Sequence, residues 1–286
     1  MYKILGLFFY LFSLSFSETV VDGLGREIEI PLKVERIVST VPSNTELIID
    51  MGLIDKIVGV DIYSEKISQE LKGLGVLNTN ALNEEKIIEL APDLVIASSH
   101  NLSKGVDSLK IFEELEIPVF VVHTSVNLED VCNSIDQMGK LLSEPGKAKV
   151  LKKRYTEKLD SIKNMTSKIK KRRRVYFEIM PEPIYTTGGK TFINSMIEVA
   201  GGRNIFSEEG GWITPSLEKL IEKNPEIIFI GEDKKELVED IKTRVEWQDI
   251  DAVKNNRIYV VDEGINRPST RVLIALEQMQ KLLEER

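Results

Sequence analysis

The chain has 286 residues, of which 46 are acidic and 38 basic, and its formal net charge is −8. Hydrophobic residues make up 42% and charged residues 29%, a balance typical of a globular protein and not of a disordered or fibrous one. The acidic balance argues against a nucleic-acid binder, and the length accommodates two domains of ordinary size.

The N-terminus predicts an export signal. Lys3 supplies a positive charge, residues 4–16 are mostly apolar, and Ser15-Phe16-Ser17 forms a small-x-small cleavage site. A membrane-spanning helix needs about 20 apolar residues, so this run is short for a span, although an uncleaved anchor is an alternative. No cysteine follows the run, which argues against a lipoprotein anchor. We therefore expect a signal peptide at residues 1–17 and a periplasmic protein that starts near Glu18.

Residues 20–31 predict a short hairpin, with glycines at its turn and Pro31 at its end. Strand-like runs follow at residues 37–41, 57–61, 94–98 and 119–123, separated by helical patterns. Strands that alternate with helices indicate parallel βα units. Ser43 and Glu46 are spaced as a capping box, which predicts the start of the first helix.

A long helix is predicted from about residue 146 to residue 170. Its apolar residues recur every three or four positions, which describes one stripe along a helix: Leu151, Tyr155, Leu159, Ile162, Met165 and Ile169. The basic run at residues 170–174 is expected to close this helix, because cations suit a helix C-terminus. The single cysteine, Cys132, lies in a preceding helix-like run and is expected to act as a small buried hydrophobe.

A second α/β series follows, with strands predicted at residues 175–179, 227–230 and 258–261 and a final helix at about 270–284. The predicted fold class is therefore α/β, with two Rossmann-like lobes that have mainly parallel sheets and are joined by a single long helix. The expected divisions are residues 18–143 for the N-terminal lobe with its hairpin, 144–171 for the bridging helix and 172–286 for the C-terminal lobe.

An internal repeat supports this division. Residues 83–96 and 216–229 share one order: a capping residue, Glu-Lys, an aliphatic-Ile-Glu run, then Pro, an acidic residue and a buried strand. Asn83 and Ser216 are good helix N-caps, and each proline ends its helix before the strand. Convergence of short helix-to-strand connections would explain the caps and prolines but not the shared Glu-Lys pair.

Catalytic motifs are missing from the sequence: it has no nucleophile elbow, phosphate loop or His-Glu-x-x-His motif. The two histidines, His100 and His123, are too few for a closed cage around a free metal ion. We therefore expect no enzyme activity, no resident metal and no cofactor.

Polar and aromatic side chains follow the predicted strands in both halves of the chain. In open α/β sheets, ligands bind beyond the carboxyl ends of the strands, so these residues predict a ligand cleft between the lobes. The candidates are Tyr63, His100 and His123 in the first half and Glu178, Met180, Tyr185, Glu232, Asp233, Glu263 and Arg267 in the second.

With these residues assembled, the chain resembles the helical-backbone, or class III, periplasmic binding proteins of cobalamin, ferric-siderophore and haem ABC importers. The resemblance covers nearly the whole mature chain. It is carried by residues 36–39, 42–46, 52–53, 56–60 and 83–96 in the first half, and by 189–193, 200–206, 266–268 and 275–277 in the second.

The resemblance implies a function, partners and site residues. A protein of this kind captures a ligand between two lobes whose relative motion is small, and delivers it, as a monomer, to an ABC permease and its ATPase. One exposed glutamate on each lobe pairs with permease arginines, and these glutamates fall on Glu85 and Glu218. A first-turn glutamate favoured by the helix dipole is the structural alternative for each.

The ligand is less sharply indicated. Tyr63 and Trp212 fall where the family contacts ligand, and Arg267 matches a cleft arginine that suits an anionic ferric chelate or a cobalamin phosphate. Residues 77–82 lack the aromatic residue that cobalamin binders carry there. Haem would need an axial ligand such as Tyr63, His100 or His123. The order of expectation is a ferric chelate, then cobalamin, then haem.

Two other functions are open. The helix-bridged architecture also resembles metal-cluster oxidoreductase subunits of the nitrogenase type, but those hold clusters with several cysteines and this chain has one. An interaction module of the cell envelope, without a small ligand, is the other alternative.

Overall fold

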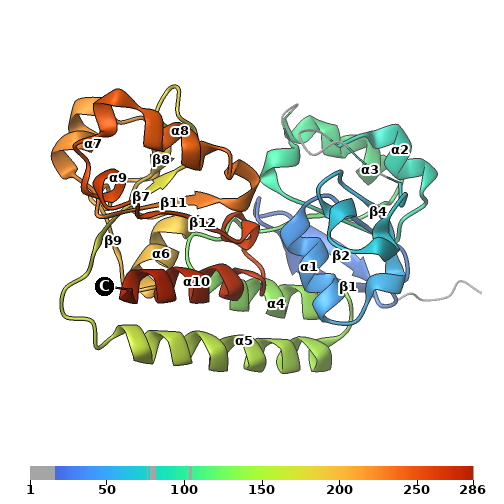
Figure 1. Ribbon diagram of the computed structural model, residues 1–286. Helices are drawn as coiled ribbons and strands as arrows, with labels where there is room; N and C mark the ends of the chain where they lie inside the picture. The colour runs from blue at the N-terminus through green and yellow to red at the C-terminus, as the bar shows by residue number, and fades with distance from the viewer. Residues whose placement is uncertain (1–16, 76, 78–81, 103–104, 286) are drawn as a thin grey trace, which may run out of the picture.

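The computed structural model describes residues 17–75, 77, 82–102 and 105–285, so all of the predicted signal peptide at residues 1–17 except Ser17 lies outside the described residues. Two α/β lobes stand side by side above one long helix, α5 (Pro145–Thr166) (Figure 1). The α/β class and the two-lobed arrangement predicted from the sequence are confirmed.

The N-terminal lobe has a four-stranded parallel sheet in the order β4-β3-β5-β6. Its strands are β3 (Ile37–Ser39), β4 (Ile57–Val60), β5 (Leu94–Ala97) and β6 (Val119–Val121), and its helices are α1 (Pro42–Asp50), α2 (Glu84–Glu89), α3 (Lys110–Glu114) and α4 (Asp130–Leu141). The predicted hairpin is present as antiparallel strands β1 (Ser17–Val21) and β2 (Glu27–Pro31). A hydrogen bond connects this hairpin to the sheet: the N–H of Gly23 donates to the carbonyl of Val121 at 2.6 Å.

The C-terminal lobe has a second four-stranded parallel sheet in the order β12-β11-β7-β9. Its strands are β7 (Arg174–Glu178), β9 (Arg203–Asn204), β11 (Ile227–Gly231) and β12 (Ile258–Val261). A separate antiparallel pair joins β8 (Thr186–Thr187) to β10 (Trp212–Ile213). The helices are α6 (Phe192–Val199), α7 (Leu217–Lys223), α8 (Leu237–Thr243), α9 (Asp251–Lys254) and α10 (Val272–Glu284).

Both sheets have the same strand order. When the four parallel strands of each sheet are numbered in chain order, the second lies at one edge, followed by the first, the third and the fourth. The repeated segments occupy the same place in both lobes, because α2 leads into the third strand β5 and α7 leads into the third strand β11. The predicted caps are confirmed: the side chains of Asn83 and Ser216 accept from the N–H groups of Lys86 at 3.1 Å and Lys219 at 3.3 Å.

One hydrophobic core runs through both lobes. The buried stripe of α5 is confirmed at Leu151, Tyr155, Leu159 and Ile162, and it packs into a cluster that includes residues of β3, α4, β7 and α10. Tyr155 also donates from its hydroxyl to the carbonyl of Leu128, at 2.9 Å. Because a close-packed interior resists deformation, we expect the two lobes to move little relative to each other.

Three local expectations are wrong. Ser43 and Glu46 do not form a capping box, because α1 begins at Pro42 and the carboxylate of Glu46 turns to Arg267 and Ser269 of the other lobe. The long helix ends at Thr166, whose hydroxyl bonds back to the carbonyl of Ile162.

The basic run therefore does not close α5. Its arginines instead serve the ends of two other helices. Arg172 donates to the carbonyl of Glu198 near the end of α6, at 2.7 Å, and Arg174 donates to the carbonyl of Asn224, the C-cap of α7, at 2.8 Å. Cys132 is half-buried in α4 and packs against the shared core, close to the expected role.

Candidate functional site: the cavity between the lobes

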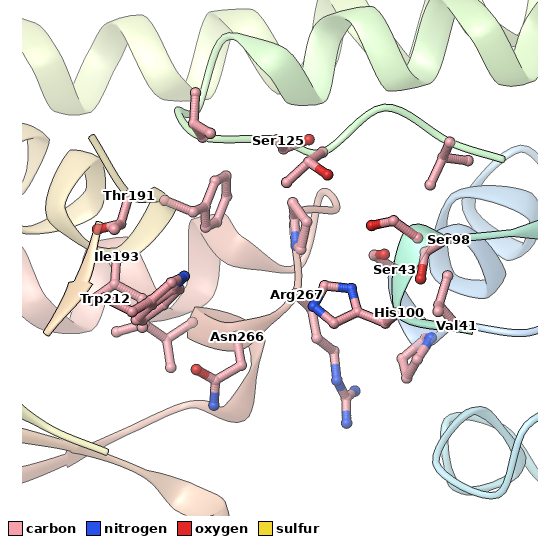
Figure 2. A pocket seen from close by; sticks show the side chains of 18 of the residues that line it. Val41, Ser43, Ser98, His100, Ser125, Thr191, Ile193, Trp212, Asn266 and Arg267 are labelled. Atoms are coloured by element: carbon pink, nitrogen blue, oxygen red, sulfur yellow. The ribbon is translucent and has the colours of Figure 1, made fainter. Parts of the chain in front are cut away.

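A cavity of about 880 Å³ opens between the two lobes, beyond the carboxyl ends of both sheets. All six residues predicted to bind ligand line it: Tyr63, His100, His123, Tyr185, Trp212 and Arg267. Side chains from the two lobes face each other across it, with Ser43, Ser98 and His100 on one side, Thr191, Ile193 and Trp212 on the other, and Arg267 between them (Figure 2).

The N-terminal wall is polar and is built from the segments that follow β3, β5 and β6. After β5 the chain turns sharply through residues 99–101, and the buried Asn101 holds this turn. Its side-chain oxygen accepts from the Thr40 hydroxyl at 2.7 Å and from the Ser98 N–H at 2.8 Å. This buried anchor fixes the backbone that presents His100 to the cavity.

His123 and Tyr63 are positioned by neighbouring polar groups. The Gln137 side-chain amide lies 2.8 Å from His123 Nδ1, so the ring is held from α4. The carboxylate of the buried Asp61 accepts from the N–H groups of Tyr63 at 2.9 Å and Ser64 at 3.1 Å. The Tyr63 ring is half exposed beside the cavity.

The C-terminal wall is mainly apolar and aromatic. Trp212 lies on β10 opposite Thr187 of β8, and its indole stacks on the ring of Tyr185, with centroids 6.3 Å apart and planes 21° from parallel. Gly188 precedes the neighbouring segment, and a Cβ on it would lie 2.2 Å from the carbonyl of Glu209. Only glycine allows the two segments to approach closely enough to form this platform.

Arg267 contacts both lobes. It follows the short turn η8 (Glu263–Asn266) after β12. Its Nη1 lies 2.9 Å from Glu46 Oε1 of α1, and its Nη2 lies 3.0 Å from Glu263 Oε2. Burial raises the pKa of Glu46, and the hydrogen bonds from Ser269 and Arg267 offset this only in part. The guanidinium is therefore paired before any ligand arrives.

The charges on the cavity wall balance. Among the lining residues, Lys190 and Arg267 are cationic and Asp233 and Glu263 are anionic. The remaining lining groups are hydroxyls, imidazoles, aromatic rings and aliphatic side chains. Such a wall suits a ligand with little net charge, because an anionic ligand would meet as many carboxylates as cations.

Not every residue at a strand end reaches the cavity. Glu178 is buried away from the cavity, and its carboxylate lies 2.9 Å from Nη1 of Arg244, the residue that follows α8. Burial raises the pKa of Glu178, and the charge of Arg244 counteracts it in part. Met180 and Glu232 are also absent from the wall that the described residues form, whereas Asp233 and Glu263 belong to it.

Sequence reasoning missed much of the polar wall and part of the apolar one. The omitted lining residues include Ser98, Ser99, Thr124, Ser125, Lys190, Phe192 and Ile193. The positions of these residues relative to the cavity could have been inferred from the sequence, because most lie within a few residues of the end of a predicted strand or the start of a helix. Most of these are hydroxyl or aliphatic side chains, which carry no chemical signal of their own, and a single lysine or phenylalanine in a loop or at a helix start is too common to indicate a site.

Glu85 and Glu218 lie outside the cavity. Both are exposed, in the first turns of α2 and α7. These two helices lie at the ends of their lobes away from α5 (Figure 1). Hydrogen bonds from the backbone and from Ser216 lower the pKa of Glu218, so it is a carboxylate at neutral pH. The two helices that carry these glutamates therefore lie on the side of the molecule away from α5, one in each lobe (Figure 1).

Within the described part of the chain, groups of three or more His, Cys, Asp or Glu side chains that could hold a metal ion do not occur. Over the same residues, no helix is both long and apolar enough to cross a membrane.

A model of the periplasmic binding protein family matches residues 37–264, which is most of the chain. The chain belongs to the periplasmic binding protein family. An ABC transporter substrate-binding lipoprotein of Bacillus subtilis, YvrC, is 32% identical over 271 residues, 92% of this chain and 84% of that protein. A vitamin B12-binding protein of Vibrio parahaemolyticus is 30% identical over 250 residues, 85% of this chain and 87% of that one.

The fold agrees with these sequence matches. A crystal structure of a possible iron-binding, periplasmic solute-binding protein of Staphylococcus epidermidis superposes with a TM-score of 0.78 at 31% identity, and covers 88% of this chain and all of that chain. The predicted resemblance to class III binding proteins is confirmed. The chain is thus a substrate-binding component of an ABC importer, which acts outside the cytoplasm with a permease and an ATPase, and belongs to a class of receptors and not of enzymes.

Proposed function

We propose that this receptor captures a cobalamin-type corrinoid in the inter-lobe cavity and delivers it to its permease. The observation that carries the proposal is the charge-balanced cavity of about 880 Å³ with the stacked Tyr185–Trp212 platform on one wall. Aromatic faces bind large planar ring systems well, and a mostly apolar wall with a few placed polar groups is the usual composition of a small-molecule site.

This order differs from the one expected from sequence, in which a ferric chelate came first. The order expected from sequence reflects the lack of an aromatic residue at 77–82, because Arg267 suits a ferric chelate or a cobalamin phosphate equally. In the structure Glu46 and Glu263 hold that guanidinium, which leaves it less available to an anionic chelate. The similarity to the vitamin B12-binding protein of Vibrio parahaemolyticus also supports placing a corrinoid first. Residues 78–81, in the stretch without the expected aromatic, lie outside the described residues.

A ferric chelate is the second candidate, and the similarity to the possible iron-binding protein of Staphylococcus epidermidis favours it. In that case Lys190 would be the remaining cation of the wall. Haem is third, with Tyr63, His100 or His123 as the side chain available to its iron. In each case the metal is part of the cargo, and we propose that the receptor holds no cofactor of its own.

Calorimetric titration of the purified protein with cyanocobalamin, ferrichrome, ferric enterobactin and haemin tests this order. We expect saturable one-to-one binding of cyanocobalamin and a higher melting temperature, since a ligand at about 100 times its Kd adds roughly 2.7 kcal/mol to the free energy of unfolding. Binding of a ferric siderophore or haemin instead would overturn the corrinoid assignment. Binding of none of the four would refute the ligand class.

For delivery, we propose that Glu85 and Glu218 dock on permease arginines, because carboxylate–arginine pairs orient partners as well as attract them. A Glu85→Ala/Glu218→Ala variant is expected to keep its ligand affinity and lose affinity for the permease in nanodiscs. The control is Glu89→Ala/Glu222→Ala, which removes two exposed carboxylates at equivalent places on the same helices. Equal loss in both variants would refute a specific docking role, and loss of ligand binding would contradict the receptor mechanism.

We also propose that residues 1–17 are a cleaved signal peptide and that the mature receptor works as a periplasmic monomer. Mass spectrometry of the exported protein is expected to give an N-terminus near Glu18. An intact Met1 in the membrane fraction would show an uncleaved anchor instead.

A further inference from the structure

Glu46 does not line the ligand cavity itself, but its carboxylate pairs with Arg267, which does, and the two residues come from different lobes. The two side chains are almost fully enclosed: 6% of the Glu46 side chain and 14% of the Arg267 side chain are exposed. Glu46 Oε1 lies 2.9 Å from Arg267 Nη1, and its Oε2 accepts from the hydroxyl of Ser269. Both carboxylate oxygens are therefore held by the C-terminal lobe.

The surroundings show that this carboxylate is fixed in place. On the side away from the ligand cavity, Glu46 borders a second, smaller cavity of about 420 Å³, together with Asp50, Arg154, Lys158 and Arg271. Arg271 is itself paired with Asp262, at 3.0 Å. Glu46 thus forms part of the partition between two cavities, and only its Arg267 contact faces the ligand.

This partition determines the electrostatic character of the ligand site. With Glu46 ionised, its carboxylate neutralises Arg267 from the side away from the ligand. The other lining charges are one cation, Lys190, and two anions, Asp233 and Glu263, so the wall has no cationic excess. Without the Glu46 charge, Arg267 would keep only Glu263 as a partner, so the positive charge of its guanidinium would be less compensated at the centre of the wall. The interaction of that charge with an anionic group several ångströms away is strong in a partly enclosed site.

We propose that Glu46 is a specificity-determining residue, which neutralises Arg267 across the cleft and so makes the cavity select electrically neutral ligands over anionic ones of the same shape. The inference rests on the proposed corrinoid binding and deepens it. It assigns the selectivity to a residue of α1 that touches the ligand site only through Arg267, so Glu46 acts as a positioning and charge-setting residue.

A matched pair of probes isolates charge from shape. Cyanocobalamin and a cyanocobalamin monocarboxylic acid differ by one side-chain amide replaced with a carboxylate. We expect the wild-type protein to bind the neutral probe more tightly than the acid. In Glu46→Gln the ratio of the two dissociation constants is expected to fall roughly tenfold, because a nearby cation loses its counter-charge.

Asp50→Asn is the matched control. Asp50 lies one helical turn further along α1, is held by Thr270 of the other lobe, and borders only the smaller cavity. This variant also weakens the contact between the lobes, but it leaves Arg267 paired. Its ratio for the two probes is expected to equal that of the wild type, so a change there would attribute the effect to loosened lobes and overturn the proposal.

Two Arg267 variants extend the test should Glu46→Gln fold poorly. Arg267→Gln alone is expected to strengthen the preference for the neutral probe, and Glu46→Gln/Arg267→Gln is expected to return the ratio toward the wild-type value. An unchanged ratio in every variant that binds cyanocobalamin would overturn the role of Glu46. Failure of the wild-type protein to bind cyanocobalamin at all would instead refute the proposed function.

Discussion

The two lobes share a strand order but build opposite walls of the same cavity. The N-terminal wall is uncharged and mainly made of hydroxyls and imidazoles, among them Ser98, His100 and His123, on segments that follow the strands. The C-terminal wall combines rings and aliphatic side chains with the charged lining residues, and its Tyr185–Trp212 platform stands on the extra pair β8–β10. Two lobes with the same strand order thus differ in the chemistry of their cavity walls because the segments that connect their strands and helices differ.

The largest expected effect tests whether the two lobes are one folding unit. Tyr155→Ala is expected to lower the free energy of unfolding by about 3–5 kcal/mol, because it empties a buried site in the shared core. Tyr155→Phe removes only the hydrogen bond to Leu128 and is expected to cost about 1 kcal/mol.

Urea denaturation followed by tryptophan fluorescence and by circular dichroism measures both quantities. Trp212 and Trp247 both lie in the C-terminal lobe, whereas circular dichroism reports the whole chain. Coincident transitions are expected. Two separated transitions would show that the lobes unfold independently and that the core does not couple them.

The second effect compares the two walls. Trp212→Ala is expected to weaken cyanocobalamin binding by roughly tenfold or more, since it removes half of the stacked platform. His100→Ala is expected to weaken it by less than Trp212→Ala does, because a single polar group near solvent contributes less than the large apolar face of an aromatic ring that a ligand covers. Titration calorimetry measures both. A larger loss in His100→Ala would reverse the roles assigned to the walls.

The third effect concerns the repeated helices. Asn83→Ala and Ser216→Ala each remove an N-cap and are each expected to lower the free energy of unfolding by about 1 kcal/mol. Similar values in urea denaturation would support energetic equivalence of α2 and α7. Values that differ by several-fold would show that the repeat is equivalent in topology only.

The smallest effect is a pair of opposite pH dependences, one in each lobe. Burial opposes ionisation of Asp22, but hydrogen bonds from Arg26 and Leu24 outweigh it and lower its pKa, so its stabilising contribution is present above about pH 4 and is lost as the pH falls through the native pKa. The pKa of Glu178 is raised, mainly by burial, so its contribution is fully present below about pH 4 and is lost as the pH rises through the native pKa.

Urea denaturation between pH 3 and pH 8 checks the signs. The destabilisation caused by Asp22→Asn is expected to grow with rising pH, and that caused by Glu178→Gln is expected to shrink. Slopes of the same sign would contradict the assigned environments.

Much of the fold was predictable because it depends on local periodicity. The stripe of α5 and the caps at Asn83 and Ser216 are short-range patterns. The strand assignments of the N-terminal lobe extended one or two residues too far, and Val41, Ser98 and His123 lie beyond the strand ends, where they line the cavity. An apolar or β-branched residue at a strand end gives no sign of where the ladder stops.

The candidate site was predictable where a side chain is chemically distinctive, as with Trp212 and His100. The electrostatics of the site could not be predicted from the sequence. Glu46 fits a capping box in sequence, yet in the structure it pairs with a residue 221 positions away. A local rule cannot anticipate a partner that only the packing of two lobes supplies, and this contact neutralises the charge that Arg267 was expected to offer a ligand.

The continuous core affects how loaded and empty receptors compete for the permease. Two lobes that share one interior keep Glu85 and Glu218 at nearly the same separation whether the cavity is full or empty. Empty receptors would then occupy the permease almost as readily as loaded ones and would compete with them for it. Uptake would rise with receptor abundance only while most copies carry cargo, and overproduction at scarce ligand would slow the import that it is meant to serve.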